Sequence, residues 1–227
     1  AGGMESIYPA VRMGADAVYL GAEQFSARAG AQNFSRQELK EAVEYCHIRN
    51  VRVYLAVNTL LRDPELKTAL SLAEYAASLP VDGFIVQDVG FASLLREAAP
   101  KIRLHASTQM TLSSPDGLEF ASGFLDLKQA VLARELSLKE IGQCVRHTDI
   151  PLEVFVHGAL CVAYSGQCFI SHAHTGRSAN RGDCNQACRL PYEVLDSQGR
   201  IVAHEKHVLS MKDNNQSDNL RALIDAG

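Results

Sequence analysis

Short runs of apolar, largely β-branched residues alternate with longer helical patterns from about residue 5 to residue 160. The predicted strands cover residues 16–20, 51–57, 83–87, 102–106, 130–133 and 152–156. They are apolar at consecutive positions, as strands are when both faces of a sheet are covered. Repeated strand–helix units of this length indicate a parallel sheet with right-handed crossovers. The chain is therefore predicted to be an α/β protein.

The helices between these strands have recognisable start signals. A serine followed three residues later by a glutamate predicts a capping box, and this spacing occurs twice, at Ser35 with Glu38 and at Ser137 with Glu140. Asp63 followed by Pro64 predicts a helix cap and a proline at the first helical position. In the helix after Ser35, a buried stripe at helical spacing is expected from Leu39, Ala42, Val43 and Cys46.

Polar side chains follow nearly every predicted strand. Barrel enzymes assemble their active sites at the C-terminal ends of their strands, whereas an open doubly wound sheet concentrates them at one switch point. The glycine-rich turn of a dinucleotide fold is absent. We therefore predict a (β/α)8 TIM-type barrel. Its predicted catalytic residues are His157, His105, Glu135 and Arg134, and its predicted substrate-binding residues at the strand ends are Asn58, Gln87, Asp88 and Gln109.

The composition is typical of a globular protein, with 47% hydrophobic and 21% charged residues among 227. A net charge of −4 argues against a globally basic nucleic-acid binder but leaves local basic patches open. No apolar run approaches the roughly 18 residues that a membrane span needs. Six unevenly spaced cysteines do not resemble a secreted disulfide scaffold, so we expect a cytoplasmic protein. Both ends of the sequence read as the interior of a longer chain, and we expect a fragment.

Residues 158–207 interrupt the strand–helix alternation and are rich in Cys, Gly, Ser, Asn and Arg. Four of the cysteines fall here with the spacing Cys161-x6-Cys168-x15-Cys184-x3-Cys188. If residues 185–189 are helical, Cys184 and Cys188 share one helix face. Four thiolates can ligate an iron–sulfur cluster or a zinc ion. The first pair is too widely spaced for a standard zinc knuckle, which favours iron–sulfur, although spacing alone leaves both open.

The two cysteines outside this region, Cys46 and Cys144, are expected to be buried free thiols. Within the region, other interpretations have less support. Cys161 with His157 four residues before it could form a thiol nucleophile and base, which is the best case for a hydrolase. The stretch from His204 to His207 lacks the spacing of a zinc-protease helix.

Three arginines, Arg177, Arg181 and Arg189, lie among the cysteines. Guanidinium groups suit phosphates or an anionic small molecule, so they are predicted to bind substrate. Ordinary charges on an exposed loop are the alternative. For Asp88, capping of the following helix is an equally good interpretation.

The stretch EVFVHGALCVAYSGQCFIS at 153–171 resembles the collagenase-like peptidase family U32. Further similar stretches are AGGMES at 1–6, GADAVYLG at 14–21, NTL at 58–60, QD at 87–88 and HASTQ at 105–109. Within the family, TGRSANRGDC at 175–184, CRLPY at 188–192 and LSMKD at 209–213 look most like the ribosomal-RNA cytidine hydroxylase branch. Related branches include transfer-RNA uridine hydroxylases and ubiquinone-pathway hydroxylases.

The resemblance implies an oxygen-independent hydroxylase that modifies a pyrimidine in ribosomal or transfer RNA. It also implies a [4Fe-4S] cluster on Cys161, Cys168, Cys184 and Cys188, with the fourth ligand open because some members draw one from further downstream. Prephenate, a small anion, is implied as co-substrate. Family members have a strand just before Ala1, another just after Gly227, and C-terminal domains that help bind RNA. The implied architecture is one partial barrel domain over 1–227, truncated at both ends, with residues 158–207 inserted as a cluster-binding segment after strand seven. A peptidase and a non-catalytic assembly factor are the alternatives.

Overall fold

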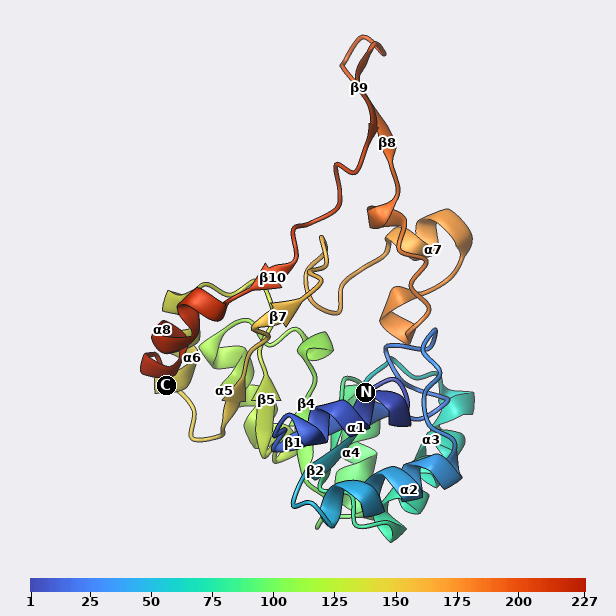
Figure 1. Cartoon of the computed structure of the whole chain (residues 1–227), viewed down its shortest axis with the longest axis vertical. Coiled ribbons are helices and arrows are strands. Elements are labelled where there is room, and N and C mark those ends of the chain that lie inside the picture. Colours follow the sequence, from blue (N-terminus) through green and yellow to red (C-terminus); the bar gives the residue numbers. More distant parts are fainter.

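The computed structural model describes all residues from 1 to 227 and is built on one six-stranded parallel sheet (Figure 1). The strands pair in their order along the chain: β1 Ala17–Gly21, β2 Arg52–Val57, β3 Gly83–Val86, β4 Leu104–Ala106, β5 Gln129–Val131 and β6 Leu152–Glu153. The intervening helices are α1 Met4–Arg12 before β1, then α2 Arg36–His47, α3 Asp63–Ser78, α4 Val89–Ala98, α5 Pro115–Leu125 and α6 Leu138–Arg146.

The strand order has no reversal, and this distinguishes the sheet from a doubly wound one, which changes winding direction at a switch point. The predicted α/β class and parallel sheet are confirmed. The sheet curls but does not close: β1 and β6 form its two edges and do not pair with each other. The structure therefore shows a six-stranded half-barrel, and the predicted truncated eight-stranded barrel stays a prediction.

The core of the protein is a cluster of 32 buried residues between the sheet and its helices. Alternate strand residues such as Leu55 and Phe84 point into this cluster, because side chains alternate between the faces of a strand. The helix after Ser35 contributes all four residues of its predicted stripe, among them Cys46. The opposite, concave face of the sheet is more polar and carries Tyr54 and His105.

The two predicted capping boxes are confirmed. Ser35 N–H donates to Glu38 Oε2 over 2.9 Å, and Ser137 N–H donates to Glu140 Oε2 over 2.8 Å. The helix near Pro64 begins one residue earlier than predicted. Its cap is Arg62, whose backbone N–H donates to Glu65 Oε2 over 2.7 Å.

The last predicted strand, residues 152–156, is wrong in its second half. Only Leu152–Glu153 joins the sheet, as β6. The chain then leaves the sheet, and β7 His157–Gly158 pairs antiparallel with β10 Asn214–Asn215. Apolar residues at 154–156 therefore do not form a buried strand.

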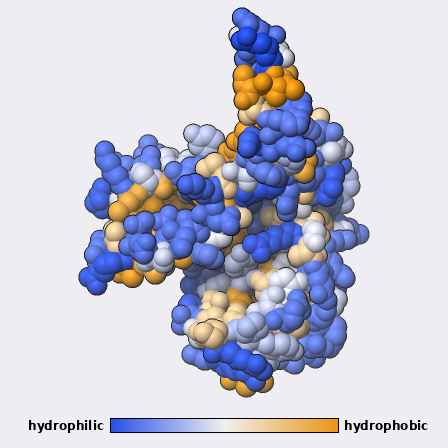
Figure 2. Space-filling view, turned by 45° about the horizontal axis from the view of Figure 1, so that its top comes forward, coloured by the Kyte–Doolittle hydropathy of each residue, from blue (hydrophilic) through white to orange (hydrophobic).

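Residues 158–207 contain little regular structure apart from α7 Ile170–Thr175 and a hairpin. The hairpin consists of β8 Tyr192–Leu195 and β9 Ile201–Lys206 and projects away from the body (Figure 1). Figure 2 shows a hydrophobic band below its hydrophilic tip. The chain then returns through β10 to α8 Leu220–Asp225. No helix in the structure has the length and apolar character to cross a membrane.

The condition under which Cys184 and Cys188 would share a helix face, a helix over residues 185–189, is not met. Gln186 has a φ of 55°, and only a short 3₁₀ turn, Ala187–Arg189, follows it. A left-handed residue cannot continue an α-helix. Cys184 and Cys188 therefore do not share a helix face.

Candidate functional site

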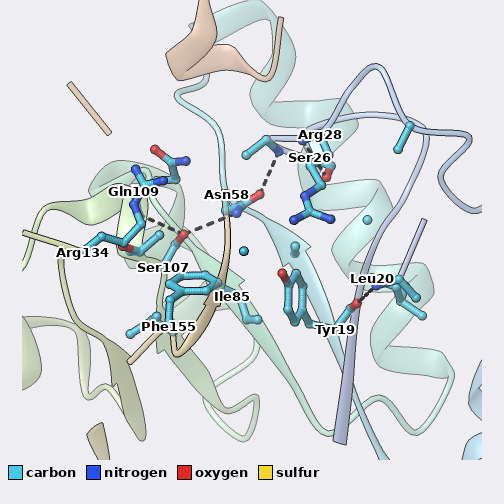
Figure 3. Close-up of a pocket in the computed structure, with 18 of the residues that line it drawn as sticks. Tyr19, Leu20, Ser26, Arg28, Asn58, Ile85, Ser107, Gln109, Arg134 and Phe155 are labelled. Atoms are coloured by element: carbon cyan, nitrogen blue, oxygen red, sulfur yellow. Dashed lines mark hydrogen bonds between the residues drawn. The ribbon is translucent and has the colours of Figure 1, made fainter. Parts of the chain in front are cut away.

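A cavity of about 270 Å³ opens at the C-terminal ends of the parallel strands (Figure 3). Every strand of the half-barrel contributes to its wall, either directly or through the residues that follow it. Its lining includes Tyr19, Arg28, Asn58, Ile85, Ser107, Gln109, Arg134, Glu153, Phe155 and His157. Among the predicted site residues, the cavity therefore brings together Asn58, Gln109, Arg134 and His157.

Asn58 organises the centre of this cavity. Its Oδ1 accepts a hydrogen bond from Ala27 N–H over 2.9 Å, and its Nδ2 donates to Ser107 Oγ over 3.3 Å. Ser107 Oγ also accepts from Gln109 N–H over 3.2 Å. These bonds join the loop after β1 to the residues that follow β2 and β4 (Figure 3).

Glu153 is the only carboxylate among the residues that line the cavity. Its Oε2 accepts a hydrogen bond from Gln129 Nε2 over 2.7 Å. Although the residue is exposed at the edge of the sheet, its carboxyl is shielded on the concave face. That desolvation raises the pKa of Glu153, against the opposing effect of Gln129.

His105 and Gln87 do not line the cavity and are buried deeper in the protein, with 2% and 5% of their surface exposed. His105 Nε2 and Gln87 Oε1 have no hydrogen-bond partner. The His105 ring lies 4.5 Å from the Tyr54 ring, centroid to centroid. Burial, with smaller effects of Arg103 and Arg52, lowers the pKa of His105 to about 4. This histidine is therefore neutral at physiological pH.

Ser165 connects the cysteine-rich segment to the strand ends. It is fully buried, and both its backbone N–H and its hydroxyl donate to the carboxylate of Glu135. Its Oγ also accepts from the backbone N–H and the Nε of Arg134, over 3.1 and 2.9 Å. The predicted catalytic residues Glu135 and Arg134 thus hold this loop in place, and only Arg134 also lines the cavity.

The contact around Ser165 extends to its neighbours. Thr111 Oγ1 donates to the Ser165 carbonyl over 2.6 Å. Gly166 has a φ of +72°, and a Cβ at this position would lie 2.0 Å from the Gln109 carbonyl oxygen. Only glycine permits both this conformation and this approach of two backbones.

A second attachment lies near Asn180, on the other side of the segment. Arg181 forms an ion pair with Glu65 over 2.6 Å and donates to the Leu60 carbonyl over 2.7 Å. A Cβ on Gly182, which has a φ of +85°, would lie 2.2 Å from the Ser26 carbonyl oxygen. Asn180 Oδ1 accepts from Cys168 N–H over 3.1 Å, which connects this attachment to the cysteines.

The remaining predicted substrate-binding residues make contacts within the protein. Arg177 pairs with Asp183 over 2.6 Å, and Arg189 donates to the Leu160 carbonyl over 2.6 Å. Asp88 caps α4 by accepting from Phe91 N–H over 2.9 Å, so its capping interpretation is confirmed. None of the three lines the cavity, and their role in substrate binding stays a prediction.

All six cysteines are free, and Cys46 and Cys144 are buried as predicted. Cys161 and Cys184 are exposed, whereas Cys168 and Cys188 are partly buried. Burial raises the pKa of Cys188; Arg189 opposes this, and the thiols of Cys161, Cys184 and Cys168 add to the rise.

The cysteines are not arranged as a formed coordination sphere. No group of three or more Cys, His, Asp or Glu side chains is positioned to hold a metal ion. The Cys184 sulfur accepts from Gln186 N–H over 3.3 Å and from Ser171 Oγ over 3.9 Å. Hydrogen bonds of this kind surround cluster-ligating sulfurs. The four thiols are thus suitable in chemistry as cluster ligands, but the structure does not gather them into a site.

Sequence reasoning missed three residues of this site: Arg28, Glu153 and Ser165. Glu153 lies in the middle of the predicted strand 152–156, where no strand-end residue was expected. In the structure β6 ends at Glu153, which places this residue at the cavity. Ser165 is a small polar residue beside Gly166, and that pairing is typical of a tight backbone approach. Arg28 lies in an irregular loop with no pattern to mark it.

Comparisons with known proteins agree on one family. The family described as "Peptidase family U32" matches residues 2–227. A relative from Escherichia coli, "23S rRNA 5-hydroxycytidine C2501 synthase", is 51% identical over 96% of this chain and 33% of its own length. "tRNA hydroxylation protein P1" from Bacillus subtilis is 35% identical over 88% of this chain and 47% of its own length.

A third relative, "Collagenase" from Porphyromonas gingivalis, is 33% identical over 100% of this chain and 57% of its own length. The chain thus spans between about a third and somewhat more than half of these curated relatives. The solved structure "The Structure of the U32 Peptidase Mk0906" has a TM-score of 0.57 at 16% identity and covers 86% of this chain and 81% of its own. It supports the half-barrel fold alone.

Proposed function

Because this chain belongs to peptidase family U32, we propose that it is part of an enzyme that hydroxylates a pyrimidine in RNA. A cytidine of ribosomal RNA is the first candidate, and a uridine of transfer RNA is the second. The observation that carries the proposal is the 51% identity over 96% of this chain to a ribosomal-RNA hydroxycytidine synthase. We further propose that the six strands are part of an eight-stranded barrel and that residues 158–207 are its cluster-binding segment.

The cavity supports a reaction on a small group brought to the strand ends. Its amide groups, Asn58 and Gln109, can donate and accept hydrogen bonds at the edges of a base. Its volume of about 270 Å³ suits a base or a small anion rather than a helical stretch of RNA. The target pyrimidine would therefore have to leave its stack, as it does in other enzymes that modify bases.

The proposal assigns a [4Fe-4S] cluster to Cys161, Cys168, Cys184 and Cys188. Such a cluster supplies electron transfer when it is bound. Leu160, the residue before Cys161 in the sequence, lines the cavity. Its carbonyl accepts a hydrogen bond from Arg189, the residue after Cys188. The thiols would thus adjoin the cavity, where prephenate is proposed as the anionic co-substrate of an oxygen-independent reaction.

A peptidase activity has less support from the site. Cys161 is exposed and forms no hydrogen bond with His157. The Ser165 hydroxyl is occupied by Glu135 and Arg134 and has no histidine partner. A nucleophile needs an adjacent base in hydrogen-bonding reach, and neither group has one.

The test is mass spectrometry of ribosomal and transfer RNA from cells that lack the gene. We expect one pyrimidine to lose a single oxygen atom, and the native gene to restore it. A gene carrying Cys188→Ser should not restore it, whereas Cys144→Ser, which alters a buried thiol of the core, should. Unchanged RNA together with cleavage of denatured collagen by the purified protein would favour the peptidase instead.

A further inference from the structure

Two guanidinium groups line the cavity without a carboxylate partner. Arg28 takes part in hydrogen bonds only through its backbone, where its N–H donates to Ser26 Oγ and its carbonyl accepts from Asn33. Arg134 donates from Nε to Ser165 Oγ over 2.9 Å, and its two terminal nitrogens have no partner in the protein. Both side chains retain free donors in a geometry suited to bidentate binding of a carboxylate.

The two arginines lie on opposite sides of the cavity. In Figure 3, Asn58 and Ser107 lie between them, with Arg28 on the right and Arg134 on the left. Arg134 is fixed in this place because Ser165, which is itself held by Glu135, accepts from both its Nε and its backbone. One ligand that satisfies both cations must therefore carry two separated anionic groups.

The floor between the arginines is largely apolar. Tyr19, Ile85 and Phe155 lie below Asn58 in Figure 3 and line the same cavity. The single acidic side chain of the lining, Glu153, is engaged by Gln129. The cavity thus combines two cations at its sides with a hydrophobic base. A concave floor of this kind suits a compact small molecule better than the outward-facing phosphates of an RNA backbone.

We propose that Arg28 and Arg134 bind the two carboxylates of one small organic dianion, whose apolar body rests on Tyr19, Ile85 and Phe155. The inference rests on the proposed function in that this dianion would be the co-substrate of the hydroxylation. The cysteine-rich segment contributes Ser165, which fixes Arg134, and the stretch just before Cys161, which lines the cavity.

Calorimetric titration of the intact protein tests the site. The probe is prephenate, which has two carboxylates, and the comparison ligand is phenylpyruvate, which has a ring and one carboxylate. We expect prephenate to bind the native protein more tightly than phenylpyruvate. Arg28→Gln and Arg134→Gln should each weaken prephenate binding about tenfold or more and remove most of this preference.

Two controls keep the outcome specific. Arg12→Gln makes the same charge change on an exposed arginine at the end of α1, outside the cavity, and should bind prephenate as the native protein does. Arg28→Lys keeps the charge but loses the planar fork, so its affinity should lie between those of the native protein and Arg28→Gln.

The inference is overturned if Arg28→Gln binds prephenate unchanged. It is also overturned if the variant loses affinity for a short RNA oligonucleotide but not for prephenate, since the arginines would then be RNA contacts. The binding result does not depend on the RNA analysis proposed above. Tight dicarboxylate binding with unmodified RNA would retain this site and reject the proposed reaction.

Discussion

Glu135 accepts two hydrogen bonds from Ser165, one from its backbone N–H and one from its hydroxyl, the latter over 2.8 Å. Ser165 lies thirty positions after Glu135. The two bonds therefore attach the loop around Ser165 to the residues that follow β5. The same hydroxyl accepts from Arg134, so one serine fixes both the loop and a guanidinium of the cavity. The pair therefore both attaches the loop and orients a side chain that lines the cavity.

Ser165→Ala should release this loop. The substitution leaves the Arg134 backbone N–H without its partner and removes a charge-assisted bond, which together cost about 2 kcal/mol of local stability. Amide hydrogen exchange over residues 162–168 should accelerate by more than about tenfold. Ser178→Ala, at a serine whose hydroxyl makes no hydrogen bond, is the control in the same segment. Equal exchange in both variants would show that the Ser165 contact carries little stability.

Gly166→Ala should disrupt the same attachment through sterics. Its Cβ would lie 2.0 Å from the Gln109 carbonyl oxygen, whereas Gly176 has nearly the same φ, +74° against +72°, and open space at its Cβ. Gly176→Ala should lower the free energy of unfolding by about 1 kcal/mol, because alanine disfavours the left-handed conformation. Gly166→Ala should cost clearly more and open residues 161–168 to limited proteolysis. If the two variants resist proteases equally, the close backbone approach is unimportant.

His105 should make stability depend on pH below neutrality. Its folded pKa of about 4 is lower than the ordinary value of 6.5, so between these values the unfolded chain binds a proton that the folded protein excludes. Stability therefore falls as pH decreases from 6.5 towards 4, with a contribution of about 2 kcal/mol between pH 7.5 and pH 5. Urea unfolding at these two pH values should show a smaller loss for His105→Gln than for the native protein. His174→Gln, at an exposed histidine, should retain the native difference.

The Arg181–Glu65 ion pair should stabilise the second attachment modestly. Its side chains are 26% and 31% exposed, so solvent weakens but does not cancel the attraction. A double-mutant cycle with Arg181→Met and Glu65→Gln should give a coupling free energy of about 1 kcal/mol that decreases at high salt. A coupling near zero at low salt would leave Gly182 and Asn180 as the contacts that hold this end.

Local sequence patterns were sufficient for the half-barrel. Ser35 with Glu38 and Ser137 with Glu140 start their helices as predicted, because capping depends on neighbours three residues apart. The predicted ends of strands were less accurate where the end depends on which distant segment the chain pairs with next. Val156 is apolar, yet β6 ends at Glu153, before it. The next residues, β7, pair with β10, and a partner so distant in the sequence cannot be read from a local pattern.

The site was predictable in its place but not in its contacts. Strand-end residues such as Asn58 and Arg134 do line one cavity, because parallel strands end at one edge. Glu135 and Arg181 instead hold a loop whose position depends on contacts far apart in sequence. No local pattern could show that an arginine is already paired, and hence that Arg28 rather than Arg181 offers free donors to the cavity.

The two attachments of the cysteine-rich segment also change the chain entropy of gathering its thiols. Free, the segment would behave as a loop of about fifty residues, whereas the fixed points at Ser165 and Arg181 divide it into shorter loops, one of about sixteen. Closing the shorter loop costs about 1 kcal/mol less in entropy. Cys168, which lies between the fixed points and whose N–H is held by Asn180, thereby has less freedom than it would in the longer loop. If the proposed cluster binds there, contacts at the strand ends would raise its affinity without touching it.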